Sequence, residues 1–126
     1  MGRFLNRDNQ RYAKFSTTKY FVDKTGMINR LLEKDDDEKF LCCSRPRRFG
    51  KSITAHMLVA YFSRGADSRS LFEPLRCVKD AVFLENLNKY DTIFMDIQAQ
   101  FVQAADNDMN PGQYIRRNIL GELQKE

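Results

Sequence analysis

The sequence is poor in the residues that build metal sites and disulfide frameworks. It has one histidine, His56, and three cysteines, of which Cys42 and Cys43 are adjacent and Cys77 is distant. This set provides neither a C-x-x-C metal pattern nor an even disulfide framework. We therefore expect His56 to be a surface or half-buried helix residue, the thiols to be reduced and buried, and the protein to be cytoplasmic.

Long apolar runs are also missing. No stretch approaches the ~18 apolar residues that span a bilayer, and the first residues, MGRFLNRDNQRYAKF, carry scattered charges with no apolar core of an export signal. We expect no membrane association. The remaining composition, 42% hydrophobic and 12% aromatic over 126 residues, is that of one folded domain.

Positive charge is concentrated at the N-terminus. The first 24 residues hold six Lys or Arg and two Asp, so this segment alone accounts for the formal net charge of +4. A basic segment of this kind can contact phosphates or nucleic acid, but charge alone is nonspecific. We expect residues 1–18 to be a solvated basic leader, and residues 19–126 to form the folded part.

The apolar pattern predicts an α/β fold. Two short apolar segments, KFLCC (39–43) and DTIFMDI (91–97), are typical of buried strands. Helices are predicted after Asp23 or Thr25, over residues 51–63 with a stop at Gly65, over 81–89, and from Asn110-Pro111 onward. Strand, glycine loop, helix and strand in this order indicate a parallel sheet. Two strands make an incomplete sheet, so the chain is expected to be part of a domain.

The segment RPRRFGKS, residues 45–52, has the end of a phosphate-binding loop. Such loops read G-x-x-x-x-G-K-[ST]: backbone N–H groups cradle the phosphates, the lysine neutralises the β- and γ-phosphates, and the hydroxyl binds Mg²⁺. Gly50, Lys51 and Ser52 fit, whereas Arg45 stands where the first glycine would be and Pro46 restricts the turn. Arg45, Arg47 and Arg48 add charge that favours a polyphosphate and equally a nucleic-acid backbone.

A second acidic partner is expected at the end of an apolar strand, where it would hold Mg²⁺ through water. Asp96 in DTIFMDI occupies such a position. An aspartate near a strand end is common, so a purely structural role is an equal alternative. No second carboxylate adjoins Asp96 to activate water, and Gln98 and Gln100 are the polar candidates nearby.

Three segments together resemble the predicted AAA-ATPase-like family: YFVDKTGMINRLL, SRPRRFGKSITAHML and SLFEPL. The resemblance covers about residues 2 to 120, and the arginine-rich loop is its specific signature. It implies a P-loop NTPase fold of the AAA-like type, with ATP and Mg²⁺ as ligands. It also implies that Tyr20, Phe21 and Val22 lie near the adenine, although core packing of these residues is an equal alternative. Family members usually continue to a PD-(D/E)XK nuclease-like domain and can form homo-oligomers.

The function expected from the sequence is that of the N-terminal, ATP-binding part of an AAA-like P-loop ATPase. Lys51 and Asp96 are the expected catalytic residues, and Ser52 and Asp96 the expected metal ligands. The expected nucleotide-binding residues are Arg45, Pro46, Arg47, Arg48, Phe49, Gly50, Lys51, Ser52, Ile53, Tyr20, Phe21 and Val22. Two alternatives remain: a nucleic-acid-binding module without hydrolysis, and a remnant that does not fold alone. Hydrolysis by this chain alone is not expected.

Overall fold

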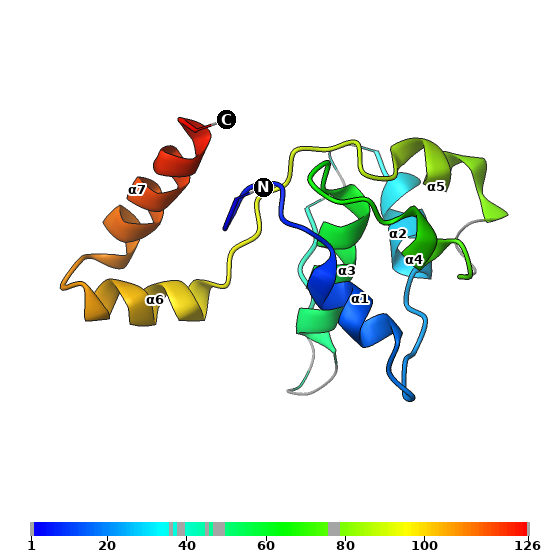
Figure 1. Cartoon of the computed structure of the whole chain (residues 1–126), viewed down its shortest axis with the longest axis horizontal. Helices are drawn as coiled ribbons and strands as arrows, with labels where there is room; N and C mark the ends of the chain where they lie inside the picture. The colour runs from blue at the N-terminus through cyan, green and yellow to red at the C-terminus, as the bar shows by residue number, and fades with distance from the viewer. Residues whose placement is uncertain are drawn as a thin grey trace.

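The structure, a computed structural model, describes residues 2–35, 37, 40–44, 46, 50–75 and 79–125. This part of the chain is helical (Figure 1). In chain order the helices are α1 (Gln10–Ser16), α2 (Gly26–Leu32), α3 (Lys51–Phe62), α4 (Arg69–Phe72), α5 (Ala81–Asn86), α6 (Ile97–Asp106) and α7 (Pro111–Leu123). None of the helices in these described ranges is long and apolar enough to cross a lipid bilayer.

The predicted α/β P-loop NTPase fold with a parallel sheet is wrong. Over the described residues no strand forms, and extended pairing is limited to two isolated bridges, Leu5 with Ile93 and Ser63 with Tyr90. Residues 40–44 have no regular structure, and Phe40 is 92% exposed. A strand is stable only when neighbours satisfy its backbone N–H and C=O groups. Ile93 pairs with the N-terminal segment, and residues 40–44 form no bridge with it.

The expectation of buried thiols is wrong for the two cysteines that can be assessed. Cys42 and Cys43 are free and exposed. They were expected to be buried because their apolar segment was expected to lie inside a sheet, and that sheet does not form. Cys77 lies outside the described residues.

Several predicted helices are confirmed. Helix α3 covers almost the whole predicted range, α5 begins at Ala81 as expected, and α7 begins at Pro111. The Asn110 side chain caps α7 by accepting a hydrogen bond of 2.9 Å from the Gly112 N–H. Helices α1, α4 and α6 were not predicted.

Gly65 does not end α3, because the helix stops at Phe62 and Ser63 is already extended. Glycine is required at position 65 for another reason. A Cβ there would lie 1.9 Å from the backbone oxygen of Asn6, so the close approach of the N-terminal segment admits no side chain.

Helices α1 to α5 pack around one aromatic core. Its buried members are Tyr12, Ile28, Met57, Ala60, Tyr61, Phe72 and Phe83. The ring centroid of Phe72 lies 5.4 Å from that of Tyr12, 5.8 Å from that of Tyr61 and 5.6 Å from that of Phe83. These distances are within the range of favourable aromatic pairs. The Tyr61 hydroxyl donates to the Phe83 carbonyl oxygen at 2.6 Å. The central helix α3 is thereby fixed in position.

The basic N-terminal segment is not simply solvated. Phe4, Leu5 and Tyr12 are buried, and Tyr12 belongs to α1 and the aromatic core. Before α1, Asn6 N–H donates to the Thr92 carbonyl at 2.9 Å and Phe94 N–H donates to the Phe4 carbonyl at 2.9 Å. The leader is therefore part of the folded structure.

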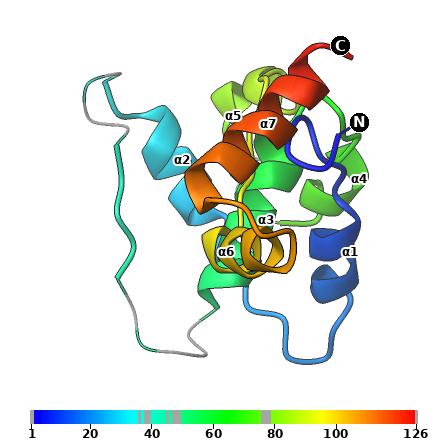
Figure 2. The same ribbon diagram turned by 90° about the vertical axis from the view of Figure 1, so that its left-hand side faces the viewer.

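Helices α6 and α7 form a pair that lies to one side of the other helices (Figures 1 and 2). Their interface buries Ala104 and Tyr114. The Glu122 carboxylate of α7 accepts hydrogen bonds from the backbone N–H groups of Arg3 (2.7 Å), Phe4 (2.9 Å) and Leu5 (2.9 Å). The N-terminal segment thus joins the α6–α7 pair to the α1–α5 body.

Candidate functional site

Helix α3 begins directly after a glycine in the left-handed conformation. Gly50 precedes the helix with φ of 81°, in the left-handed region that glycine adopts without strain. Its carbonyl oxygen accepts both the backbone N–H and the hydroxyl of Thr54, each at 2.9 Å. The first N–H groups of the helix have no partners within the helix, and the helix dipole makes this end partly positive.

Lys24 lies directly against Gly50. Its Nζ is 2.9 Å from the place that a Cβ on Gly50 would occupy, so a larger residue would displace the lysine. The local structure sets the position of Lys24: the Asp23 carboxylate accepts hydrogen bonds from the backbone N–H and the hydroxyl of Thr25, which is fully buried. The Asp-Lys-Thr sequence therefore forms a tight turn that places a cation next to Gly50.

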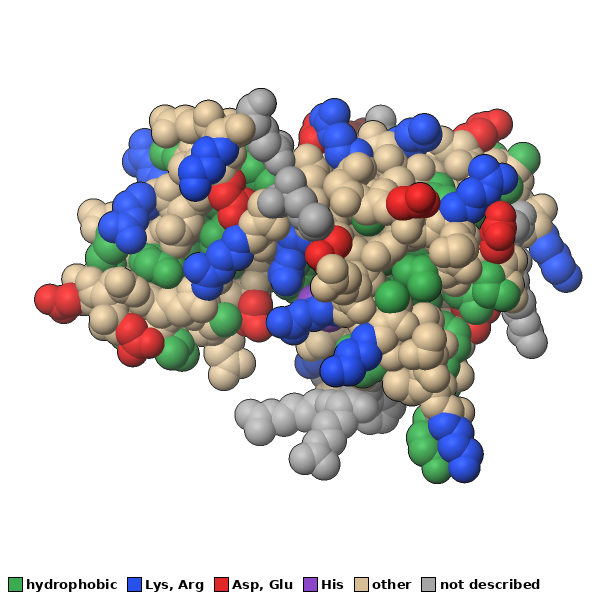
Figure 3. All heavy atoms as spheres, in the orientation of Figure 1, with side chains coloured by type: hydrophobic (Ala, Val, Ile, Leu, Met, Phe, Trp, Pro, Cys, Tyr) green, Lys and Arg blue, Asp and Glu red, His purple; other side chains and the backbone are tan. Residues whose placement is uncertain are grey.

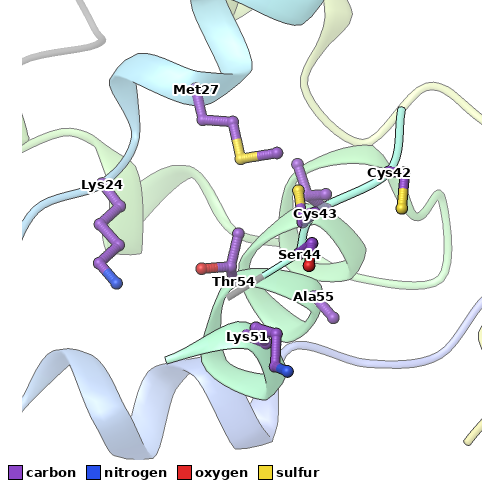
Figure 4. Close-up of a pocket in the computed structure, with 9 residues that line it drawn as sticks. Lys24, Met27, Cys42, Cys43, Ser44, Lys51, Thr54 and Ala55 are labelled. Atoms are coloured by element: carbon purple, nitrogen blue, oxygen red, sulfur yellow. The ribbon is translucent and has the colours of Figure 1, made fainter. Parts of the chain in front are cut away.

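A cavity of about 680 Å³ is lined by Lys24 and by residues of the first turns of α3. We call it the lysine pocket. Figure 4 shows Lys24 on one side, Lys51 and Thr54 on α3, and Met27 and Cys43 on the remaining wall. Cations thus stand on two sides of the α3 N-terminus.

A smaller cavity of about 270 Å³ lies against one face of α3, and we call it the aromatic pocket. Gly50, Ile53, Thr54 and Met57 form its α3 wall, at the spacing that places residues on one face of a helix. The opposite wall is aromatic and apolar and contains Tyr12, Phe15, Tyr20, Phe21 and Val22. The structure thus brings Tyr20, Phe21 and Val22 to Gly50 and Ile53.

A third cavity of about 600 Å³, the basic hollow, lies against the other face of α3. Its charged lining residues are Arg3, Arg7, Arg11, Lys51 and Asp96, so four cations face one carboxylate. Ser52 and His56 also line it. Figure 3 shows Lys and Arg side chains gathered around the histidine in the middle of one face. The sequence-predicted residues Lys51, Ser52 and Asp96 therefore line the same cavity.

Asp96 has a structural role as well. It is the N-cap of α6, and its Oδ1 accepts a hydrogen bond of 3.0 Å from the Ala99 N–H. An N-cap aspartate uses one carboxylate oxygen in this way. Asp96 is exposed, so its other oxygen can interact with a ligand in the basic hollow.

His56 reports the positive potential of the basic hollow. It is half-buried on α3, as predicted, and its ring lies 4.9 Å from that of Phe94. Burial lowers the pKa of His56 below its ordinary value of 6.5. The charges of Arg11 and Arg7 lower this pKa further, while Asp96 acts in the opposite direction. The pKa of His56 is thus lowered first by burial and then by cations that share its cavity.

Part of the predicted site cannot be placed. Arg45, Arg47, Arg48 and Phe49 lie outside the described residues, and Pro46 is exposed. Other residues of the site were missed by sequence reasoning, namely Lys24, Arg7, Arg11 and their contacts. The Asp-Lys-Thr sequence at residues 23–25, in which an aspartate can form a local turn, was a usable signal for Lys24, whereas nothing local marked the two arginines.

Comparison with known proteins identifies one family. The family model described as "Predicted AAA-ATPase" matches residues 9–121. A search of curated proteins and a search of solved structures each gave no significant match. The matched range includes the turn that carries Lys24, the aromatic pocket, the start of α3 and most of the basic hollow. The chain belongs to the predicted AAA-ATPase family.

Proposed function

We propose that the chain binds Mg-ATP around the N-terminus of α3. The proposal depends on two cavities and one cation at this helix end. The aromatic pocket lies on one face of α3, the basic hollow lies on the other, and Lys24 lies against Gly50. A nucleotide has the matching order of parts, with an apolar base at one end and a polyphosphate at the other. Membership in the predicted AAA-ATPase family supports the choice of ATP.

The phosphates would lie over the helix N-terminus. Gly50 opens the helix, and the N–H groups of its first turn, together with the Lys51 ammonium, would bind phosphate oxygens. The proposed phosphate-binding set also includes Pro46, together with Arg45, Arg47, Arg48 and Phe49, which lie outside the described residues. Lys51 would neutralise the β- and γ-phosphates, as the lysine does in phosphate-binding loops.

Mg²⁺ fits the residues of the basic hollow. The ion prefers oxygen ligands, keeps several waters and is usually held by one or two protein groups and the substrate phosphates. The Ser52 hydroxyl and the Asp96 carboxylate line the same cavity and are both exposed. Bound Mg²⁺ would neutralise phosphate charge, with Ser52 as a direct ligand and Asp96 acting through water.

The base would occupy the aromatic pocket, against Tyr20, Phe21, Val22 and Ile53. The pocket volume of about 270 Å³ is at the low end for a ligand site, which suits the base alone. Phe21 is half-buried and packs edge-on against Tyr12 at 6.3 Å. Val22 and Tyr20 are exposed and so can cover a base that enters from solvent.

The proposal is tested by titrating Mg-ATP into wild type and Lys51→Ala. A ligand at 100 times its dissociation constant stabilises the native state by about 2.7 kcal/mol, which a thermal-shift assay detects. We expect this rise in wild type and its loss in Lys51→Ala. The matched control is Lys89→Ala, an exposed lysine that lines none of the three cavities. Equal ATP affinity in Lys51→Ala and wild type would exclude the site.

Nucleic-acid binding is the second candidate, because the basic hollow attracts any phosphate chain. The two functions differ in their dependence on salt and on the base pocket. Binding through several backbone phosphates weakens steeply between low and physiological salt, whereas a nucleotide also gains contacts in the aromatic pocket. A DNA oligonucleotide that stabilises the protein when Mg-ATP does not would favour this alternative.

A further inference from the structure

We propose that Arg7 and Arg11, from the N-terminal segment and α1, recognise the terminal phosphate of the nucleotide and set a preference for ATP over ADP. This inference rests on the proposed function. It assigns a role to the basic leader, whose arginines lie far in sequence from the phosphate loop.

The arrangement of basic residues in the hollow supports this role. The basic hollow has two basic walls: Lys51 on the first turn of α3, and Arg7 and Arg11 on the N-terminal side. A polyphosphate that starts at the aromatic pocket passes over the helix N-terminus and Lys51 before it reaches the hollow. The last phosphate is the one that would meet the two arginines.

The position of Arg7 is fixed before any ligand binds. Its guanidinium lies over the Phe94 ring at 4.9 Å from the centroid, a favourable cation–π distance. The fully buried Ser63 hydroxyl donates to the Arg7 carbonyl oxygen at 2.7 Å. A preorganised guanidinium loses little conformational freedom when it binds a phosphate in a two-pronged manner.

The charges of both arginines are available to a ligand. Neither Arg7 nor Arg11 forms an ion pair with another described residue. His56 lines the same hollow, and its pKa is lowered by burial and, in addition, by the charges of Arg11 and Arg7. The field of such charges in a partly enclosed cavity attracts and orients an anion.

Gln100 provides an independent indication that the hollow receives a polar ligand. It lines the basic hollow, is 4% exposed, and its Oε1 has no hydrogen-bond partner among the described residues. A buried polar atom without a partner is unfavourable and calls for an explanation. An acceptor oxygen suits a water molecule on the terminal phosphate or on Mg²⁺, since that water can donate to it.

The test compares Mg-ATP, Mg-ADP and inorganic triphosphate by isothermal titration calorimetry. A charge-assisted hydrogen bond corresponds to about tenfold or more in affinity, so we expect Arg7→Gln and Arg11→Gln each to weaken ATP and triphosphate binding by about that factor. ADP affinity should change by less than about threefold. Lys14→Gln, an exposed lysine on α1 that lines none of the three cavities, removes the same charge and should bind like wild type.

Folding and function are separated by further variants. Arg7→Lys keeps the charge and should bind ATP more tightly than Arg7→Gln, and melting temperatures without ligand show whether each variant is folded. If Arg7→Gln and Arg11→Gln bind ATP as Lys14→Gln does while Lys51→Ala loses binding, the role of the arginines is wrong and the nucleotide site stands. If wild type binds triphosphate through the arginines but not ATP, the phosphate site stands and the nucleotide function is wrong. If wild type binds neither ATP nor triphosphate, both the proposed nucleotide site and the role of the arginines are wrong.

Discussion

The α1–α5 body and the α6–α7 pair are held by different kinds of interaction. The body buries seven hydrophobic residues in one cluster, four of them aromatic. The α6–α7 pair leaves Phe101, Val102, Leu120 and Leu123 exposed and is joined to the N-terminal segment by a carboxylate among backbone N–H groups. Burial thus stabilises the part that holds α3, and polar contacts stabilise the part that carries Asp96 and Gln100.

The difference means that the two walls of the candidate site respond to different changes. One wall, with Lys51 and Ser52, depends on the aromatic core. The other, with Asp96 and Gln100, depends on hydrogen bonds that pH and charge can alter. Substitutions in the core, at Glu122 and at Asp96 therefore test these dependences separately.

The largest effect is expected from the aromatic core. Phe72 is fully buried and contacts three other rings, so Phe72→Ala should lower the free energy of unfolding by about 3–5 kcal/mol. The matched control is Phe101→Ala on α6, whose side chain is 55% exposed and whose loss should cost within about 0.5 kcal/mol. Urea denaturation measures both. Similar losses in the two variants would contradict the contrast between body and pair.

A smaller effect is expected at Glu122. Glu122→Gln removes the charge that receives three backbone N–H groups and should weaken the junction by about 1–2 kcal/mol. Hydrogen exchange should accelerate at the amides of Arg3, Phe4 and Leu5. Glu85→Gln, which replaces an exposed glutamate on α5, should leave these amides unchanged. Unaltered exchange in Glu122→Gln would show that the carboxylate does not hold the segment.

The same junction should depend on pH. Burial alone would raise the pKa of Glu122, but hydrogen bonds from the N–H groups of Leu5, Phe4 and Arg3 and the charge of Lys125 lower it below the ordinary value of 4.5. A carboxyl whose pKa is lowered by folding contributes its stability above the unfolded pKa and loses it as the pH falls through the folded pKa. NMR should show the Phe4 and Leu5 amides shifting below pH 4.5 in wild type. In Glu122→Gln this transition should be absent.

The smallest stability effect separates the two roles of Asp96. Asp96→Ala removes the cap of α6 and should cost about 1 kcal/mol, whereas asparagine caps as well as aspartate. Asp96→Asn should therefore melt like wild type and yet weaken Mg-ATP binding by removing the charge near Mg²⁺. Calorimetry with and without Mg²⁺ measures the loss. If Asp96→Asn binds Mg-ATP with wild-type affinity, Asp96 caps α6 but takes no part in nucleotide binding.

Local sequence signals predicted four of the seven helices in the described residues, and the predicted sheet does not form there. Helix α7 was predictable because Asn110 and Pro111 define its start, and α3 because its apolar residues recur with helical spacing. The segments 39–43 and 91–97 look like strands, but strand formation depends on partners elsewhere in the chain, which a pattern of five to seven residues cannot specify. Helix α6 was missed for a related reason: Asp96 was interpreted as the end of a strand, although it is the N-cap of a helix.

The candidate site divides in the same way. Gly50, Lys51 and Ser52 are contiguous, so a motif contains them. Arg7 and Gln100 reach the same hollow from opposite ends of the chain, and only tertiary structure brings them together. The leader was expected to be solvated because its charges dominate its composition, yet its apolar residues Phe4, Leu5 and Tyr12 are buried and anchor it to the fold.

The contacts of Glu122 also have a consequence for the order of folding. They join residues 117 to 119 positions apart, whereas the core of the body is complete by Phe83. Contacts of such long separation form late, because the chain between them must first be ordered. On the ribosome, the N-terminal residues emerge long before α7 is synthesised, so the body can form before the Glu122 carboxylate reaches the N-terminal segment.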